Sequence, residues 1–243
     1  MPATDSLTLA YYPSATAAVQ SAQRYLAQRL SDIRQPLLLL SSGGSALAIL
    51  APEMSRAIDR RVTIGVLDER YSFDPASNNF SQLAATEFFQ AAVQRQARFI
   101  DTRVKPGETL PALAARFGAA LRAWRERNPQ GEIIITQGIG ADGHTAGIMP
   151  WPEDPKQFNE LFELRDVLVR GYSCVGKNPF SERVTVTLPW LRSEVRSSVA
   201  LVVGKEKTAA LRKLMASIGT LAATPARIMR EMKEVRLFTD IKL

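Results

Sequence analysis

The only histidine of this chain lies in a glycine-rich segment, residues 138–145 (GIGADGHT). His144 follows Asp142 by two residues, and glycines on both sides leave its ring accessible. A structural histidine usually stands on an apolar face, and this segment has none. Imidazole titrates near neutral pH, which suits general acid–base chemistry. We therefore predict that His144 is a catalytic residue.

A second polar cluster, Asp68-Glu69-Arg70, directly follows the apolar residues 62–67. Two acids and an arginine at the end of a strand can orient a sugar hydroxyl and clamp an anionic group. Taken alone, the cluster is more typical of a solvated loop that contains a local ion pair.

A third cluster, residues 42–45 (SGGS), follows the apolar residues 37–40. Glycines let backbone N–H groups approach an anion closely, and the start of a following helix adds a favourable dipole. A plain strand-to-helix turn has the same composition. The cluster is thus a candidate phosphate site that needs support from the rest of the chain.

Strands and helices alternate along the sequence, and several strands are apolar throughout. The predicted strands cover residues 37–40, 62–67, 98–100, 132–137, 167–170, 183–187, 199–203 and 234–238. The predicted helices cover residues 14–33, 46–58, 78–93, 109–127, 205–217 and 225–233. Strands that are apolar on both sides favour a parallel sheet covered on both faces. Such sheets bind ligands beyond the carboxyl ends of their strands, where we expect all three clusters.

The length and composition fit one ordinary globular unit. The chain has 243 residues, 46% of them hydrophobic, without repeats or a linker of shifted composition, so we expect a single domain over residues 1–243. One cysteine, Cys174, excludes an intrachain disulfide, and one histidine with one cysteine argues against a zinc site. The longest apolar run is far too short to span a membrane, and the N-terminus lacks a signal-peptide pattern, so we expect a cytoplasmic protein.

The chain is basic, with 31 Lys and Arg against 24 acidic residues and a net charge of +7. Such a balance suits nucleic acid, an anionic membrane surface or small anionic substrates. The densest basic stretches, residues 116–127 and 205–213, carry their charges at helical spacing, as solvated helix faces do. Charge alone therefore does not identify a partner, and no pattern predicts the oligomeric state.

The three clusters in this order resemble the 6-phosphogluconolactonases, within the larger group that includes the glucosamine-6-phosphate deaminases/isomerases. The family pattern Ser-Gly-Gly-Ser-Thr-Pro is similar to residues 42–47 (SGGSAL), and Asp-Glu-Arg with a later Ser-Asn is similar to residues 68–70 and 77–78. The pattern Gly-x-Gly-x-Asp-Gly-His-Thr-Ala-Ser-Leu-Phe-Pro is similar to residues 138–150. Weaker similarities at residues 183–187, 204–207 and 225–226 extend the resemblance over nearly the whole chain.

The resemblance implies a doubly wound, Rossmann-like α/β fold, with a mostly parallel sheet and helices on both faces. It implies hydrolysis of 6-phospho-D-glucono-1,5-lactone to 6-phosphogluconate, a step of the oxidative pentose phosphate pathway. His144 would activate the attacking water as general base, and Asp142 or Asp68 would orient its imidazole or the sugar hydroxyls. The residues that would hold the phosphate are Gly43, Gly44, Ser45, Arg70, Arg183 and Lys207, with Lys177 as a further candidate.

The same resemblance implies no metal and no organic cofactor. The expected partner is a small phosphorylated sugar lactone, with no nucleic acid and no membrane. A lactone is already a reactive ester, so one positioned base and an anion clamp are sufficient machinery.

Several residues depart from the family pattern. Ala46 and Leu47 replace Thr and Pro, which removes a hydroxyl from the candidate phosphate loop. Residues 147–150 (GIMP) replace Ser-Leu-Phe-Pro, and residues 178–180 interrupt a Lys-Pro-rich segment. These changes bear on phosphate affinity and on the identity of the substrate.

Two alternatives remain open at this point. A glucosamine-6-phosphate deaminase/isomerase carries a glutamate in an Asn-Glu-Pro segment after its Asp-Gly-His, whereas no acid occurs here between His144 and Glu153. A non-catalytic sugar-phosphate-binding protein, as in the effector domains of some transcription regulators, would normally carry a DNA-binding helix pair. The residues before Pro36 supply only one helix.

Overall fold

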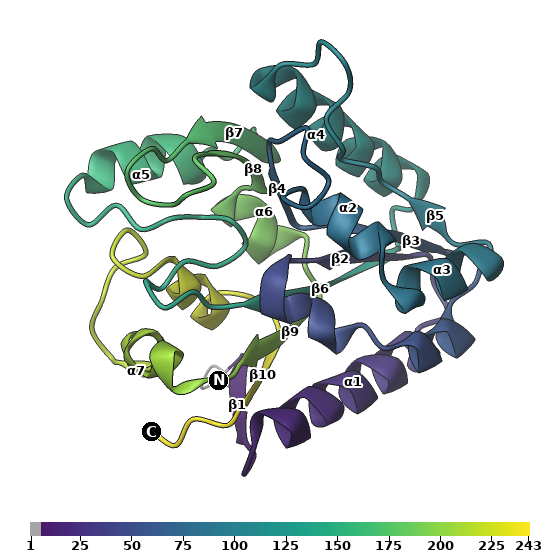
Figure 1. Cartoon of the computed structure of the whole chain (residues 1–243), viewed down its shortest axis with the longest axis horizontal. Helices are drawn as coiled ribbons and strands as arrows, with labels where there is room; N and C mark the ends of the chain where they lie inside the picture. Colours follow the sequence, from purple (N-terminus) through teal and green to yellow (C-terminus); the bar gives the residue numbers. More distant parts are fainter. Residues whose placement is uncertain (1–5) are drawn as a thin grey trace.

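The computed structural model describes residues 6–243, which fold around a seven-stranded parallel sheet (Figure 1). The strand order is β1-β10-β9-β6-β2-β3-β5. These strands are β1 (Leu7–Tyr11), β2 (Leu37–Ser41), β3 (Val62–Val66), β5 (Arg98–Phe99), β6 (Glu132–Gly138), β9 (Ser197–Val202) and β10 (Val235–Thr239).

The central strands are buried on both faces, as their unbroken apolar sequences predict. In β2, Leu37 and Leu39 pack into one hydrophobic layer, whereas Leu38 and Leu40 pack into the other. This division follows from the alternation of side chains along a strand. The burial of both sets explains why the strand lacks any polar residue before Ser41.

Helices cover both faces of the sheet (Figure 1). One layer contains α1 (Ala15–Asp32), the 3₁₀ helices η1 (Gly44–Ile49) and η2 (Pro52–Ala57), α2 (Asn79–Ala84) and α3 (Glu87–Gln94). The other contains α4 (Leu110–Arg127), α5 (Pro155–Phe162), α6 (Leu188–Ser193), α7 (Thr208–Met215) and the 3₁₀ helix η4 (Pro225–Arg230). The doubly wound, mostly parallel α/β prediction is therefore confirmed.

The direction of chain winding reverses between β2 and β6. After β2 the chain continues to β3 and β5 on one side, and after β6 it continues to β9 and β10 on the other. Ser41 at the end of β2 pairs with Thr136 near the end of β6. The loops that leave these two strands separate here and open a crevice, which is where such sheets bind ligands.

A second, three-stranded antiparallel sheet stands beside this crevice. It consists of β4 (Asp68–Arg70), β8 (Glu182–Val186) and β7 (Val169–Ser173) in the order β4-β8-β7. The segment 68–70 was expected to be a loop, and that expectation is wrong. Its pairing places Arg70 directly opposite Arg183, which no local pattern in the sequence indicates.

Four predicted helices differ from the structure in detail, and one of them, over residues 205–217, begins as the 3₁₀ helix η3 (Lys205–Lys207) before α7. The predicted helix over residues 46–58 is two 3₁₀ helices, because Pro52 begins a new turn. The predicted helix over 78–93 is divided into α2 and α3, and the side chain of Thr86 caps the second by accepting a hydrogen bond from Phe89 N. The predicted helix over 225–233 is the 3₁₀ helix η4.

Among the helices of residues 6–243, none combines the length and the apolar character that a membrane crossing requires.

Candidate active site

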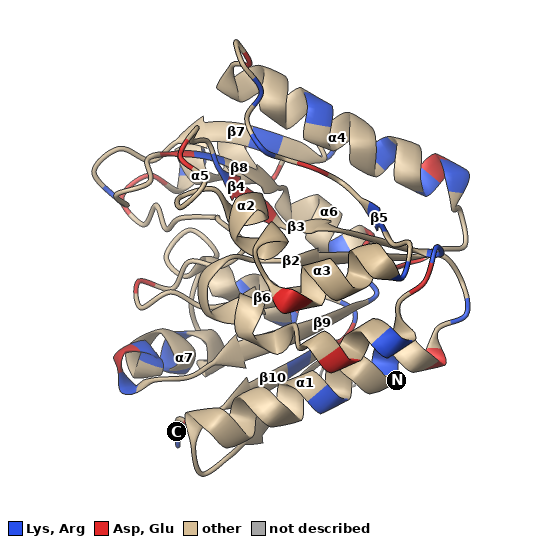
Figure 2. Ribbon diagram, turned by 45° about the vertical axis from the view of Figure 1, so that its right-hand side comes forward, with Lys and Arg blue, Asp and Glu red and all other residues tan. Residues whose placement is uncertain are grey.

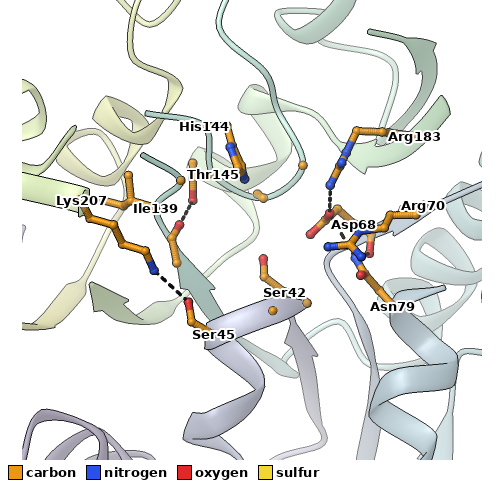
Figure 3. Close-up of a pocket in the computed structure, with 16 residues that line it drawn as sticks. Ser42, Ser45, Asp68, Arg70, Asn79, Ile139, His144, Thr145, Arg183 and Lys207 are labelled. Atoms are coloured by element: carbon orange, nitrogen blue, oxygen red, sulfur yellow. Dashed lines mark hydrogen bonds and ion pairs between the residues drawn. The ribbon is translucent and has the colours of Figure 1, made fainter. Parts of the chain in front are cut away.

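A pocket of about 190 Å³ opens at the carboxyl ends of β2 and β6 (Figure 3). Eight of the ten predicted site residues line it, namely Gly43, Gly44, Ser45, Asp68, Arg70, His144, Arg183 and Lys207. They come from segments far apart in the sequence, and the two sheets bring them together. The other two do not line it: Asp142 contacts the ring of His144, and Lys177 pairs with Glu153 outside the pocket.

His144 is held by Asp142 through two hydrogen bonds. The ring Nδ1 lies 2.6 Å from Oδ1 of Asp142, and the backbone N–H of His144 donates to the same oxygen at 3.0 Å. Burial acts to raise the pKa of Asp142, but its hydrogen bonds with His144 and the neighbouring imidazole keep that pKa below its usual value. Because Asp142 engages Nδ1, Nε2 is the ring nitrogen left available on the ring that points into the pocket (Figure 3).

The glycines of this loop are required by its shape. Gly140 N–H donates to the carbonyl of His144 at 2.9 Å, and Gly143 N–H donates to the carbonyl of Gly140 at 2.9 Å. A Cβ on Gly140 would overlap with Nδ1 of His144, and Gly143 has φ +93°, a conformation that L side chains rarely adopt. The glycines on both sides of the histidine therefore allow the loop to adopt the shape that turns its ring towards the pocket.

One side of the pocket carries two arginines and an aspartate. Arg183 Nη2 donates to Asp68 Oδ2 at 3.2 Å, and both side chains are almost fully buried. The guanidinium of Arg70 lies 4.0 Å from the centre of the Phe180 ring. Burial, together with the positive charge of Arg183, lowers the pKa of Arg70, whereas Asp68 and Glu69 act in the opposite direction.

The opposite side carries a lysine and the glycine loop (Figure 3). Lys207 Nζ donates to Ser45 Oγ at 3.2 Å, and burial lowers the pKa of this lysine despite the nearby Glu206 and Asp240. Ser45 stands in the first turn of η1, where backbone N–H groups have no partner within the helix. The ring of His144 thus stands between Lys207 on one side and Arg70 and Arg183 on the other (Figure 3).

Two further polar side chains line the pocket: Asn79, which the sequence analysis missed, and Ser42, which belongs to the candidate phosphate cluster 42–45. Asn79 donates through Nδ2 to the backbone oxygen of Asp68 at 2.9 Å, whereas its Oδ1 has no partner among residues 6–243. The hydroxyl of Ser42 is also buried and unpartnered within the described part of the chain. Buried polar atoms are normally paired, so both are suited to meet a polar ligand. The adjacent asparagines Asn78 and Asn79 were the feature of the sequence that could have indicated a polar ligand contact. Only Asn79 lines the pocket, because the side chain of Asn78 caps α2.

Glu69, the other acid of the cluster 68–70, does not line the pocket. Its carboxylate accepts hydrogen bonds from the backbone N–H groups of Arg70, Asn79 and Phe80 and from the hydroxyl of Thr102, at 2.6–3.0 Å. Burial raises its pKa to about 7, although these hydrogen bonds lower it. Glu69 therefore ties β4 to the start of α2 and positions its neighbours.

Lys177 does not line the pocket. Its ammonium group pairs with Glu153 and lies 4.6 Å from the centre of the Trp151 ring. A lysine already engaged by a carboxylate and an aromatic face is poorly placed to bind a phosphate in the pocket. In residues 6–243, no three His, Cys, Asp or Glu side chains gather in a way that could hold a metal ion.

The fold and the pocket define an α/β protein with a His–Asp pair between cationic side chains at the switch point of a parallel sheet. A family model described as glucosamine-6-phosphate isomerases/6-phosphogluconolactonase matches residues 13–238. The chain belongs to this family. A comparison with curated proteins finds no significant match.

Solved structures share the fold over nearly the whole chain. The 6-phosphogluconolactonase of Trypanosoma brucei is 18% identical, with 97% of both chains covered and a TM-score of 0.72. The 6-phosphogluconolactonase of Thermotoga maritima is 19% identical, with 96% of this chain and 98% of that chain covered and a TM-score of 0.67. A monomeric glucosamine-6-phosphate deaminase is 17% identical, with 96% of both chains covered and a TM-score of 0.64. At such identities, the likeness shows the common fold.

Proposed function

We propose that this protein hydrolyses 6-phospho-D-glucono-1,5-lactone to 6-phosphogluconate, the lactonase step of the oxidative pentose phosphate pathway. The observation that carries the proposal is the pairing of His144 with Asp142, which turns a basic Nε2 towards a pocket lined with cations. Membership of the family supports it, as does the structural likeness to proteins named 6-phosphogluconolactonase.

In this mechanism, His144 is the general base. Its Nε2 removes a proton from water as the water oxygen bonds to the lactone carbonyl carbon, which forms a tetrahedral intermediate. The bond between that carbon and the ring oxygen then breaks, and His144 returns the proton to the departing oxygen. The carboxylate of Asp142 holds the ring in the required tautomer and stabilises the imidazolium that forms between the two steps.

The cationic side chains would bind the phosphate of the substrate. Arg70, Arg183 and Lys207 line the pocket together with the backbone at Gly43–Ser45, whereas Asp68 is the only carboxylate among the described residues that line it. This excess of positive charge suits a dianionic phosphate. Asp68 contacts Arg183 and Asn79, so we assign it to positioning these groups and to contacts with sugar hydroxyls.

The arrangement favours a lactonase over the related deaminase/isomerase. The deaminase group uses a glutamate that assists the histidine in ring opening, but no acid lies between His144 and Glu153, and Glu153 is paired with Lys177 outside the pocket. Asp142 is already engaged in holding the ring. The remaining pocket carboxylate, Asp68, is bound to Arg183.

A comparison of substrates tests the proposal. The protein would be incubated with freshly generated 6-phosphogluconolactone and, separately, with glucosamine-6-phosphate, and acid release and ammonium release would be measured against spontaneous rates. Acceleration of lactone hydrolysis alone supports the proposal. Ammonium release without lactone hydrolysis would make the protein a deaminase, and binding of sugar phosphates without turnover would make it a binding protein.

A further inference from the structure

A second concave surface lies at the opposite end of the sheet from the pocket. Three cavities of about 310, 260 and 390 Å³ join there, because the first two share Arg98 and the last two share Arg60 and Arg61. Thr63 at the start of β3 and Asn128 at the end of α4 line the first two, which places them at the amino ends of the strands.

Six arginines line these cavities, and we call the surface the arginine groove. They are Arg60, Arg61, Arg95, Arg98, Arg116 and Arg127. Figure 2 shows basic segments gathered at the end of α3, at β5 and at the end of α4. The groove accounts for much of the excess positive charge that the active-site pocket does not use.

Most of these arginines lack an acidic partner. Arg61 pairs with Asp59, and Arg116 pairs with Glu108. The other four are exposed and have no carboxylate within 4.0 Å among residues 6–243. The two acids that line the groove, Asp59 and Asp101, are already paired with arginines.

Some arginines elsewhere on the molecule are paired, and others, like Arg24 and Arg212, are exposed and without a carboxylate partner among residues 6–243, so the groove is distinguished by the gathering of unpaired arginines in adjoining cavities. Arg125 pairs with Glu194, and Arg192 pairs with both Glu163 and Glu231. Like charges gathered in one groove repel each other, and an anionic ligand would relieve that repulsion. Guanidinium groups bind phosphate through two parallel hydrogen bonds, which an ammonium group cannot do.

We propose that the arginine groove binds a flexible chain of phosphate groups. A groove that joins three cavities fits an extended chain better than a single phosphate, and its free guanidiniums are distributed along it rather than converging on one point. Single-stranded nucleic acid and inorganic polyphosphate share this chemistry. This binding is independent of the proposed lactonase activity, because the groove shares no lining residue with the active-site pocket.

Fluorescence anisotropy with a labelled oligothymidylate and, separately, with a labelled inorganic polyphosphate tests the proposal. The groove variant is Arg60→Glu/Arg98→Glu. The matched control is Arg24→Glu/Arg212→Glu, which has the same net charge but changes exposed arginines of α1 and α7. We expect the groove variant to bind roughly tenfold or more weakly, with the slope of log K against log salt shallower by about 1.4 for two lost contacts.

The possible outcomes distinguish the two ligands from each other and show which results would overturn the proposal. Binding of either ligand, or of both, by wild type and by the control variant but more weakly by the groove variant supports the proposal and identifies the source. Binding of neither ligand at physiological salt overturns it, as does an equal loss in groove and control variants. Equally tight binding of polyglutamate also overturns it, because it would show attraction by charge alone. If thermal unfolding shows that the groove variant is unfolded, Arg60→Gln/Arg98→Gln replaces it.

Discussion

The Nδ1 atom of His144 lies 2.6 Å from Oδ1 of Asp142, and the same carboxylate oxygen accepts the backbone N–H of His144. The carboxylate therefore fixes both the ring and the peptide that carries it. Because Nδ1 faces the aspartate, Nε2 is the ring nitrogen left to act on a ligand in the pocket. This relationship makes a carboxylate outside the pocket lining essential to the proposed chemistry.

Asp142→Asn removes the charge of this carboxylate while keeping its size. We expect turnover to fall by roughly 10²–10⁴-fold with little change in KM, since the amide no longer stabilises the required tautomer or the imidazolium. Steady-state kinetics with circular dichroism as a folding control measures the effect. Unchanged turnover in a folded variant would show that Asp142 does not support the base.

Arg70→Ala should mainly raise KM, because the guanidinium would contact the phosphate in the ground state and in the transition state alike. Loss of a charge-assisted contact of about 1.5–3 kcal/mol predicts a rise of about 10- to 150-fold. Lys177→Ala removes a cation that lies outside the pocket and should leave KM unchanged. Equal rises in both variants would contradict the placement of the phosphate.

Gly140→Ala places a methyl group where it overlaps with the ring of His144. The loop must shift, so we expect turnover to fall by roughly 10²-fold or more in a protein that remains folded, since small displacements of a catalytic group are costly. Gly107→Ala is the control for the steric overlap, because a Cβ added at Gly107 (φ +73°) has nothing within 4 Å. It should cost about 1 kcal/mol of stability and no activity. Wild-type turnover in Gly140→Ala would mean that the observed loop shape is not required.

Glu69 should make stability depend on pH in the range from about 4.5 to 7. Burial raises its pKa in the folded protein to about 7, so the folded state binds the proton more tightly than the unfolded state. The stability that this group contributes is fully present below about pH 4.5 and is lost as pH rises through 7. Urea unfolding of wild type and Glu69→Gln at pH 5 and pH 8 measures it. The variant should lack this part of the pH dependence, and identical profiles would exclude Glu69 as its source.

The central strands of the sheet and the two glycine-rich loops that follow β2 and β6 could be predicted because their signals are local. The apolar runs at residues 37–40, 62–67 and 132–137 are too short for helices and too uniformly apolar for exposed strands. Each run ends in polar or glycine-rich residues, and parallel strands bring such ends to one edge. The candidate catalytic loop and the glycine loop were therefore placed correctly beside each other.

Other features depend on contacts that the sequence does not reveal. Strand β4 exists because Asp68 pairs with Thr185, far along the chain, and the inward turn of Glu69 depends on the start of α2 and on Thr102. Lys177 matched a weak family segment, but Glu153 and Trp151 hold it away from the pocket.

Three elements received no prediction, and their signals are short or mixed. The strand β1 is a partly exposed edge strand, and α5 and α6 have only eight and six residues. In α5 a recognisable start was present, because Asp154 caps the helix and Pro155 occupies its first turn. These two residues predict where the helix begins, but they do not predict that the helix packs against the second sheet.

The most direct test of the central claim is hydrolysis of freshly generated 6-phosphogluconolactone by wild type and His144→Ala, each measured against the spontaneous rate. We predict clear acceleration by wild type and a loss of turnover of roughly 10²–10⁴-fold in the folded variant. Equal acceleration by both proteins would remove His144 from the mechanism. No acceleration by folded wild type would contradict the proposed activity itself.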